Sequence, residues 1–363
     1  MKIDLIAGAR PNFMKIASII DAIHAARSEN KDIEYRLIHT GQHYDKNMSE
    51  SFFTQLAIPH PHVNLGAGGG TQSEQTAAIM IGYEKLLMEE KTDLCLVVGD
   101  VNSTMACSIV AQKLHVPVAH VEAGIRSGDW TMPEEINRLV TDAITNFFFI
   151  TTPEAGDKLK KSGVSEDKIF WVGNTMIDTL LKHRNRFQQP PFWAELGLQK
   201  NEYLVITLHR PANVDEDDKL KVLIDEIIVN SHGLPLIFPA HPRTAKILAK
   251  LGISYENLHI TEPLGYLEFN YLVENAKAVI TDSGGITEET TVMGVPCITL
   301  RDNTERPETV TIGTNELIGT DPRAIQPAME RLFSGKWKKG GIPELWDGKA
   351  GQRVVNTLVS LGK

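Results

Sequence analysis

Short hydrophobic runs alternate with amphipathic stretches along the whole chain. In the first half the runs have the nearly continuous apolar character of buried strands, and they read KIDLIAG, EYRLIHTG, DLCLVVGD, VPVAHVEAG, NFFFIT and KIFWVG. Stretches with helical periodicity separate them, for example 104–114 and 153–162. Apolar strands that alternate with helices predict a parallel sheet with helices on both faces.

The same pattern restarts after a proline-containing break, QQPPFW at 188–193. The later strand candidates are YLVITLH, LPLIFPA, LHIT, KAVITDSGG and PCITL. The restart predicts an α/β protein with two Rossmann-like parallel-sheet domains in tandem, an interdomain cleft and a hinge near 173–195. We place the first domain at 1–173 and the second at 174–349; the pattern alone does not decide which domain the last helix, about 348–361, joins.

Composition fits this picture and narrows the function. The 363 residues suffice for about two domains, and no apolar run approaches the ~18 residues of a membrane span. The strand pattern begins at the first residues, so we expect no signal peptide and a cytoplasmic protein. The formal net charge of −9 argues against a nucleic-acid partner. Three well-separated cysteines in apolar contexts predict reduced core residues: Cys95, Cys107 and Cys297.

Polar and titratable residues gather just after the predicted strands. In doubly wound sheets, ligands bind beyond the carboxyl ends of the strands, so these positions predict a small-molecule site contributed by both domains. The residues are Arg10, Lys15, Asp100, Glu122, His209, Arg210, His241, Arg243, Asp282 and Ser283.

The segment TDSGGITEETTVMGVP, 281–296, is the clearest candidate for an anion site. A strand ends, Gly284 and Gly285 follow, and a helix is expected from near Ile286, so bare backbone N–H groups and the helix dipole would attract a phosphate. Ser283 can add a hydroxyl donor, and Glu289 could hold ribose hydroxyls. A tight turn with a serine cap is the competing interpretation; the anion site is favoured because two more cations follow, Arg301 and Arg306.

Two other motifs give weaker signals. GARPNFMK brings Arg10 and Lys15 to a helix start, which alone is typical of a solvated helix end. His209 and His241 lack metal-ligand spacing, and we expect no metal; each is followed by an arginine, which favours contact with phosphate or sugar hydroxyls over a capping role.

The stretch HVEAGIRSGDWTMPEEINR, 120–138, places charge where a buried strand ends. Thr131 and Glu134 have the spacing of a helix capping box. Glu122 and Asp100 would be costly to bury unpaired. If their strands are neighbours, these two carboxylates and Glu134 converge, and mutual repulsion would raise pKa values as acid/base catalysis requires. The apolar residues of the helix are expected to face the core: Ile136, Leu139, Val140 and Ile144.

These motifs resemble the non-hydrolysing UDP-N-acetylglucosamine 2-epimerases, in order and over almost the whole chain. The matching segments are GARPNFMK, GDVNST, the 120–138 stretch, VGNTMID, the HR of TLHRPAN, FPAHPR, TDSGGITEE and RDNTERPE. The resemblance implies a GT-B-like fold in which the C-terminal helix, about 350–363, joins the first domain. It also implies a homodimer, a UDP-sugar substrate and no cofactor.

The resemblance also implies roles for individual residues. Phe269 would stack on uracil, Glu289 would hold the ribose, and His241 would lie in the same nucleotide pocket. The diphosphate would be bound by Ser283, Gly284, Gly285, Arg10, His209 and Arg306. The acid/base carboxylates would be Asp100, Glu122 and Glu134, with Lys15 close to them and Glu135 as the substitute if Glu134 only caps its helix.

The expected reaction inverts C2 of UDP-N-acetylglucosamine to give UDP-N-acetylmannosamine. The C2 proton is weakly acidic because no carbonyl adjoins it, and departure of UDP from C1 makes it removable. The family is understood to eliminate UDP to a glycal and to add it back with protonation from the other face. Carboxylates near C2, cations on the diphosphate and exclusion of water serve such a reaction.

Some family members are activated by their own substrate, which binds an allosteric pocket. This chain differs from them in the segments TGQHYD (40–45) and HRPANVD and in having the GAGGG loop, so we do not expect that pocket here. A 2-epimerase of UDP-2,3-diacetamido-glucuronate fits the same segments. Three further functions stay open at this point: a hydrolysing epimerase, a GT-B glycosyltransferase and a non-catalytic nucleotide-sugar sensor.

Overall fold

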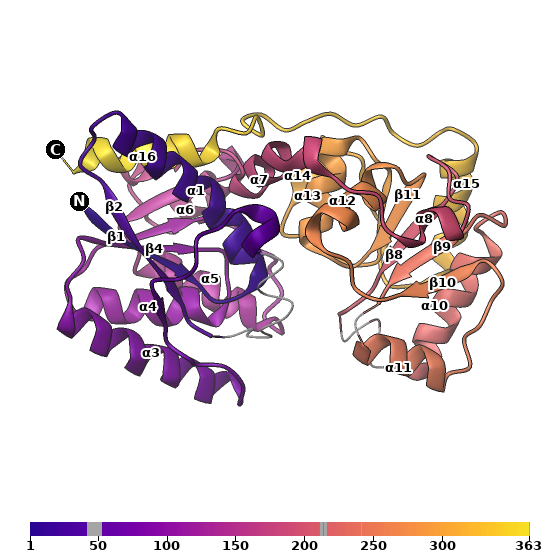
Figure 1. Cartoon of the computed structure of the whole chain (residues 1–363), viewed down its shortest axis with the longest axis horizontal. Helices are drawn as coiled ribbons and strands as arrows, with labels where there is room; N and C mark the ends of the chain where they lie inside the picture. Colours follow the sequence, from indigo (N-terminus) through magenta and orange to yellow (C-terminus); the bar gives the residue numbers. More distant parts are fainter. Residues whose placement is uncertain (42–52, 211–212, 214–215, 241, 363) are drawn as a thin grey trace. The chain divides into compact units, whose positions relative to one another are not determined.

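The computed structural model describes residues 1–41, 53–210, 213, 216–240 and 242–362, and it divides into two compact units (Figure 1). Unit 1 comprises Met1–Lys182 and Glu344–Lys363, and unit 2 comprises His183–Pro343. Most of the TGQHYD and HRPANVD segments and all of His241 lie outside the described residues.

Unit 1 is built on a seven-stranded parallel sheet with the order β3-β2-β1-β4-β5-β6-β7. The strands are β1 (Lys2–Ala7), β2 (Glu34–His39), β3 (Val63–Asn64), β4 (Leu94–Val98), β5 (Val118–Val121), β6 (Phe147–Ile150) and β7 (Ile169–Trp171). Its helices are α1 (Arg10–Ser28), α3 (Gln72–Glu89), α4 (Asn102–Lys113), α5 (Pro133–Ala143), α6 (Pro153–Lys161), α7 (Thr175–His183), the 3-10 turn η1 (Glu166–Lys168) and α16 (Ala350–Leu361).

Unit 2 repeats this topology with six parallel strands in the order β10-β9-β8-β11-β12-β13. The strands are β8 (Leu204–Thr207), β9 (Leu236–Pro239), β10 (Leu258–Thr261), β11 (Ala278–Thr281), β12 (Cys297–Thr299) and β13 (Asn315–Leu317). The helices are α8 (Phe192–Glu195), α10 (Asp217–Val229), α11 (Pro242–Lys250), α12 (Tyr266–Glu274), α13 (Gly284–Met293), α14 (Pro307–Thr311) and α15 (Ile325–Phe333), with 3-10 turns η2 (Arg184–Arg186) and η3 (Pro322–Ala324).

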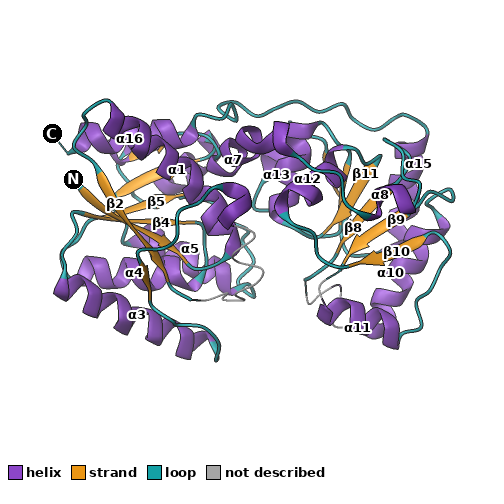
Figure 2. Ribbon diagram, viewed as in Figure 1, coloured by secondary structure: helices purple, strands orange, loops and turns teal. Residues whose placement is uncertain are grey.

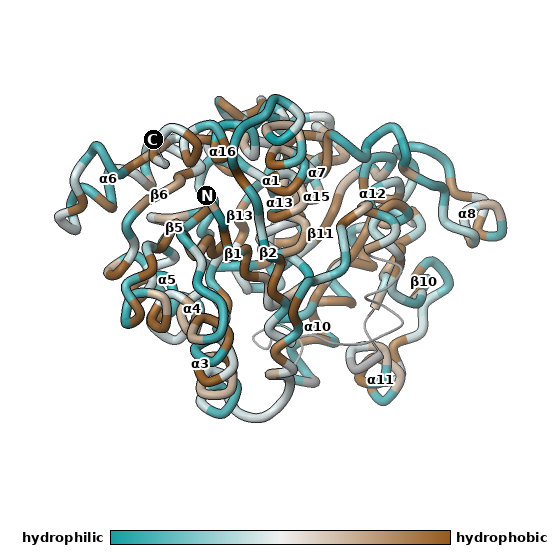
Figure 3. The backbone as a smooth tube through the Cα atoms, turned by 60° about the vertical axis from the view of Figure 1, so that its left-hand side comes forward, coloured by the Kyte–Doolittle hydropathy of each residue, from teal (hydrophilic) through white to brown (hydrophobic). Residues whose placement is uncertain are grey.

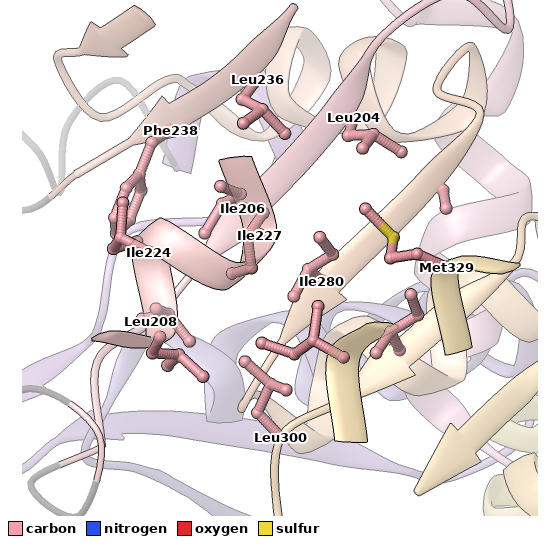
Figure 4. Packing of buried hydrophobic residues seen from close by; sticks show 14 of the residues in the cluster. Leu204, Ile206, Leu208, Ile224, Ile227, Leu236, Phe238, Ile280, Leu300 and Met329 are labelled. Atoms are coloured by element: carbon pink, nitrogen blue, oxygen red, sulfur yellow. The ribbon is translucent and has the colours of Figure 1, made fainter. Parts of the chain in front are cut away.

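Helices cover both faces of each sheet (Figure 2). In unit 1, α1 packs against α16 on one face and α3 packs against α4 on the other. In unit 2, residues of β8 alternate between the two faces: Leu204 and Ile206 pack with α10 and α15 (Figure 4), whereas Val205, and Tyr203 just before the strand, pack with α12. The tandem parallel-sheet prediction is therefore confirmed.

The strands are buried on both faces, which explains their continuous apolar sequences. Hydrophobic colour runs along strands such as β11, while the outer helix α3 alternates between hydrophobic and hydrophilic (Figure 3). Thr71 caps α3 and exchanges hydrogen bonds with Glu74. The three cysteines are buried and unbonded, which confirms their core assignment. The short strands β3 and β13 were not predicted, because two or three residues give no recognisable period.

Both sheets reverse strand order at one point, between β1 and β4 in unit 1 and between β8 and β11 in unit 2. Such reversals leave room at the carboxyl ends of the two central strands, where helices turn away to opposite faces. The candidate site residues follow these strands.

The C-terminal helix α16 is fixed to unit 1 by a buried carboxylate. Asp178 of α7 accepts hydrogen bonds from the backbone N–H groups of Ala350 (3.1 Å) and Gly351 (2.7 Å), in the first turn of α16. Burial nevertheless raises the pKa of Asp178 to about 6. Asp347 adds to the rise, while Arg353 and the two N–H groups oppose it.

We predict that Asp178 makes unit 1 less stable as the pH rises. The protonated form is favoured by folding, so its stabilisation is complete below pH ~4 and is lost as the pH passes about 6. The difference between ~3.9 for an exposed aspartate and about 6 here corresponds to ~3 kcal/mol. Relative to Asp178→Asn, the wild-type free energy of unfolding should fall by about this amount between pH 4 and pH 7. Urea unfolding of both proteins measures it, and parallel pH profiles would contradict it.

Candidate active site

The first group of site residues lies at the carboxyl ends of β1, β4 and β5, which are neighbours in the sheet of unit 1. Lys15 Nζ of α1 lies 2.7 Å from Glu122 Oε2, and both side chains are largely buried. A Cβ placed on Gly99 would lie 3.2 Å from Lys15 Nζ and 3.9 Å from Glu122 Oε2. The glycine therefore leaves the ion pair room against the end of β4.

Glu122 has a backbone conformation that side chains rarely adopt. Its φ is +72°, in the left-handed region, and the residue is buried. Backbone N–H groups of Glu122 and Ala123 both donate to the Phe149 carbonyl, which holds the turn in place. A strained, buried glutamate costs the fold on the order of 1–3 kcal/mol, and such positions cluster at functional sites.

Asp100 is held by helix α5. Its carboxylate accepts hydrogen bonds from Arg138 Nε (3.0 Å) and Nη2 (2.7 Å), and Asn137 Nδ2 donates to its backbone carbonyl (2.8 Å). Asp100 and Glu122 thus each face their own cation. The expected repulsion among the carboxylates stays a prediction. We define Lys15, Asp100, Glu122 and Arg138 as the unit 1 charged cluster.

The two glutamates at the start of α5 have different environments. Glu135 is buried and accepts from Ser127 N (2.9 Å), Gly128 N (3.1 Å) and Arg138 Nη1 (2.5 Å). Burial would raise its pKa, but these bonds outweigh it and lower the pKa. Glu134 is partly exposed, and within the described part of the chain its carboxylate has no hydrogen-bond partner. Glu135 therefore supports the loop, and Glu134 is the carboxylate that a ligand can reach.

Two predictions about α5 are wrong. The residue at the helix cap is Met132, and the Thr131 hydroxyl donates to Asp129 instead of capping the helix. The apolar residues do not all face the core: Ile136 is 38% exposed. The helix instead buries a polar face, namely Glu135, Asn137, Arg138, Thr141 and Asp142. The loop before α5, through Ser127 and Gly128, and the unit 1 charged cluster supply hydrogen-bond partners to this polar face, and these partners make its burial favourable.

A buried His–Asp pair supports the cluster from behind. His120 of β5 places one ring nitrogen 2.7 Å from Asp142 Oδ1 and the other 2.8 Å from the Gly99 carbonyl. The ring thus lies between a carboxylate and a backbone carbonyl. Asp142 also accepts from Gly124 N (3.0 Å) and pairs with Arg126 (2.6 Å). The His120–Asp142 pair thereby joins α5, β5 and the turns after β4 and β5.

The second group of site residues lies at the amino end of α13 in unit 2. The helix begins at Gly284, two residues earlier than predicted, with Ser283 as the N-cap. The Ser283 side chain makes no capping bond, and Ser283, Gly284 and Gly285 are all partly exposed. The first N–H groups of a helix have no intrahelical partner, so this turn can bind an anion.

A salt bridge lies beside this turn. Arg301 donates to both carboxylate oxygens of Glu305 (2.8 and 2.7 Å), and a Cβ on Gly284 would lie 3.8 Å from Arg301 Nη1. Burial would raise the pKa of Glu305, but the bonds from Arg301 outweigh it and lower the pKa to about 2. Arg301 therefore lies beside the start of α13, but its charge is already paired with Glu305. The sequence pattern had instead predicted that Arg301 would be a cation that attracts an anionic ligand.

The strand ends of β8 and β11 meet through Asp282. Its fully buried carboxylate lies 2.7 Å from His209 Nδ1 and also accepts backbone N–H bonds from His209 and Arg210. The His209 side chain is 59% exposed.

Glu289 lies on the next turn of α13, fully inside unit 2. Burial raises its pKa to about 8, although Tyr266 donates its hydroxyl to Glu289 Oε1 (3.1 Å). The preceding residue, Glu288, forms a buried ion pair with Arg306. Arg306, predicted to lie near a diphosphate, therefore has a carboxylate partner on α13.

Two remaining candidates are found on helices beside these groups. Phe269 of α12 is partly buried and packs against the core of the α12 face. Arg10 is the first residue of α1, and burial lowers the pKa of its guanidinium, which stays charged at neutral pH. His241 lies outside the described residues, so its predicted role stays a prediction.

Within the ranges that the structure describes, no cluster of histidine, cysteine and carboxylate side chains could hold a metal ion. None of the described helices is long and apolar enough to cross a membrane.

Comparison with known proteins identifies the chain's relatives. A family model described as UDP-N-acetylglucosamine 2-epimerase matches residues 25–359. The UDP-N-acetylglucosamine 2-epimerase of Methanocaldococcus jannaschii is 42% identical, with 99% of each chain covered. A crystal structure of that relative in complex with UDP-GlcNAc and UDP has a TM-score of 0.89 and covers 99% of this chain and 100% of its own. The UDP-2,3-diacetamido-2,3-dideoxy-D-glucuronate 2-epimerase of Pseudomonas aeruginosa is 39% identical, with 99% and 100% covered.

Two tandem doubly wound sheets with these neighbours define a protein of the GT-B-like class. Within that class, the chain belongs to the UDP-N-acetylglucosamine 2-epimerase family, as its motifs indicate.

We predict that replacing the two adjacent glutamates of α5 has different effects on the free energy of unfolding, because only Glu135 is buried and paired. Glu135→Gln weakens a buried ion pair and should lower the free energy of unfolding by ~1–3 kcal/mol. Glu134→Gln, the matched control, should change it by less than ~0.5 kcal/mol because that carboxylate has no partner to lose. Denaturant unfolding of the two variants measures the difference; equal losses would contradict the assignment.

Proposed function

We propose that this protein epimerises C2 of a UDP-2-acetamido sugar, with UDP-N-acetylglucosamine and UDP-N-acetylmannosamine as the interconverted pair. The observation that carries the proposal is the strained, buried Glu122, paired with Lys15 at the carboxyl end of β5 in a chain of this family. The relative of known structure was crystallised with UDP-GlcNAc and UDP, which supports the same ligand class here.

Unit 2 is assigned to the nucleotide. The backbone N–H groups at the start of α13 and the Ser283 hydroxyl bind the diphosphate, with His209 and Arg10 as further donors. Glu289 accepts hydrogen bonds from the ribose, and Phe269 stacks on the uracil. His241 and Arg306 complete the nucleotide site in this proposal.

Unit 1 is assigned to proton transfer at C2. One carboxylate takes the C2 proton while the C1–O bond breaks and its electron pair leaves with UDP, which gives a glycal with a C1–C2 double bond. A second carboxyl group, in its protonated form, then gives its proton to the opposite face of C2 as UDP adds back to C1, and is left as a carboxylate. Glu122, Asp100 and Glu134 are the candidates, and Lys15 and Arg138 orient the first two.

No step of this reaction changes the overall oxidation state of the sugar or consumes water, so the proposed reaction needs no redox cofactor. Assembly as a homodimer and a location in the cytoplasm are the remaining parts of the proposal, on the strength of the family resemblance.

A second substrate is favoured by one observation. The relative from Pseudomonas aeruginosa is named for UDP-2,3-diacetamido-2,3-dideoxy-D-glucuronate and is 39% identical over nearly both chains, close to the 42% of the UDP-N-acetylglucosamine enzyme. The elimination chemistry is the same for both sugars, so specificity depends on groups that contact C3 and C6.

We predict that the protein exchanges the C2 hydrogen of UDP-N-acetylglucosamine with solvent. Incubation in D₂O, followed by NMR, should give deuterium at C2 and both C2 epimers, with the UDP linkage retained. Higher kcat/KM for the diacetamido-glucuronate would favour the second substrate. Free N-acetylmannosamine would indicate a hydrolysing enzyme, and binding without exchange of either sugar would contradict the proposal.

We also predict that nucleotide affinity depends on the ionisation of Glu289. Ribose hydroxyls donate to the ionised carboxylate, but a group with a pKa of about 8 is mainly protonated at neutral pH. Affinity for the UDP-sugar should therefore rise up to about tenfold per pH unit below pH 8 and level off above it. Calorimetric titration measures this as the affinity ratio of wild type to Glu289→Gln, which cancels other ionisations. A ratio that does not change with pH would contradict the role.

A further inference from the structure

A single buried carboxylate organises the loop that follows β8. Asp282 is fully buried, and its oxygens accept from the backbone N–H of His209 (3.1 Å), the backbone N–H of Arg210 (3.0 Å) and Asn213 Nδ2 (3.1 Å). The fourth contact is different in kind, since it goes to a ring nitrogen: His209 Nδ1 lies 2.7 Å from Asp282 Oδ1.

The protonation of the His209 ring follows from these contacts. An ionised carboxylate only accepts hydrogen bonds, so the 2.7 Å contact of His209 Nδ1 with Asp282 Oδ1 is a hydrogen bond when Nδ1 carries a hydrogen. Burial would raise the pKa of Asp282, but the bonds from His209, Arg210 and Asn213 outweigh it and lower the pKa. The pair therefore keeps its carboxylate ionised at neutral pH.

The opposite side of the ring is available to a ligand. The His209 side chain is 59% exposed, and among the described residues Nε2 has no hydrogen-bond partner. His209 follows β8, whereas Asp282 and Ser283 follow β11, the parallel neighbour of β8. The ring therefore lies at the same end of the sheet as the start of α13.

We propose that Asp282 is a positioning residue that fixes the Nδ1–H form of His209 and presents Nε2 to the diphosphate of the nucleotide sugar. This inference rests on the proposed function. As the C1–O bond breaks, its electron pair moves onto the β-phosphate oxygen, and a hydrogen bond from Nε2–H stabilises the added charge. The carboxylate behind the ring stabilises the imidazolium that this bond requires, as in other Asp–His pairs.

A purely structural role is the competing explanation, because Asp282 also holds the backbone of the loop. Asn213 offers a matched comparison. It donates to Asp282 and to the Leu300 carbonyl (3.2 Å), so Asn213→Ala loosens the same loop without touching the histidine contact.

The test compares Asp282→Asn, His209→Gln, the double variant and Asn213→Ala. The asparagine amide presents a donor where Nδ1–H needs an acceptor, so Asp282→Asn should lower kcat by ~100-fold or more while the Kd for UDP changes less than about fivefold. His209→Gln should lose a similar factor, and the double variant should lose no more than either single variant. Asn213→Ala should lose less than about tenfold in kcat.

NMR of protein labelled with ¹⁵N at histidine gives a readout that needs no turnover. The His209 signals, assigned by their loss in His209→Gln, should show a protonated Nδ1 in wild type and a changed tautomer in Asp282→Asn, with UDP added as the probe. An unprotonated Nδ1 in wild type, additive losses in the double variant, or equal losses in Asp282→Asn and Asn213→Ala would each overturn the proposal. If the wild type exchanges C2 of neither sugar, the proposed function fails, and the NMR result still decides whether Asp282 sets the tautomer.

Discussion

The ion pair between Lys15 and Glu122 is the constraint on which unit 1 depends. Two charges held out of water cost several kcal/mol unless they are paired and hydrogen-bonded, and here the pair lies where β1, β4 and β5 end side by side. Gly99 leaves space for it, and the left-handed turn at Glu122 directs the carboxylate to it. Helix α5 then buries a polar face, because its charged residues complete the network around Asp100.

In the proposed function, unit 2 has a different electrostatic task from unit 1, which is to stabilise negative charge on the nucleotide. In the proposed reaction the departing diphosphate carries several negative charges, and the start of α13 offers fixed backbone dipoles that need no rearrangement as that charge grows. Its neighbouring arginines, Arg301 and Arg306, are already paired with carboxylates. The electrostatic potential at the start of α13 is therefore set mainly by the oriented backbone N–H groups and by Asp282, and less by unpaired cations.

The sequence predicted the architecture well because parallel strands buried on both faces have an unmistakable apolar signal. Family motifs predicted which strand ends carry the site, although the roles of those residues stay predictions. Local pattern failed at α5, where Thr131 and Glu134 have capping spacing but Asp129 takes the threonine hydroxyl. It also missed that Arg138, Asp142 and Asp282 act as partners of the candidate residues, since such pairings join residues 22 to 73 positions apart, for example His120 with Asp142 and His209 with Asp282. No local period encodes contacts of that range.

The most direct measurement of the central claim is C2 deuterium exchange by Glu122→Gln. The glutamine keeps the shape of the side chain but removes the charge that pairs with Lys15 and the capacity to move a proton. The account predicts that UDP binds this variant with nearly wild-type affinity, because Glu122 is not among the residues proposed to contact the nucleotide, while the exchange rate falls by ~100-fold or more. Exchange at a wild-type rate, or loss of UDP binding in a folded variant, would contradict it.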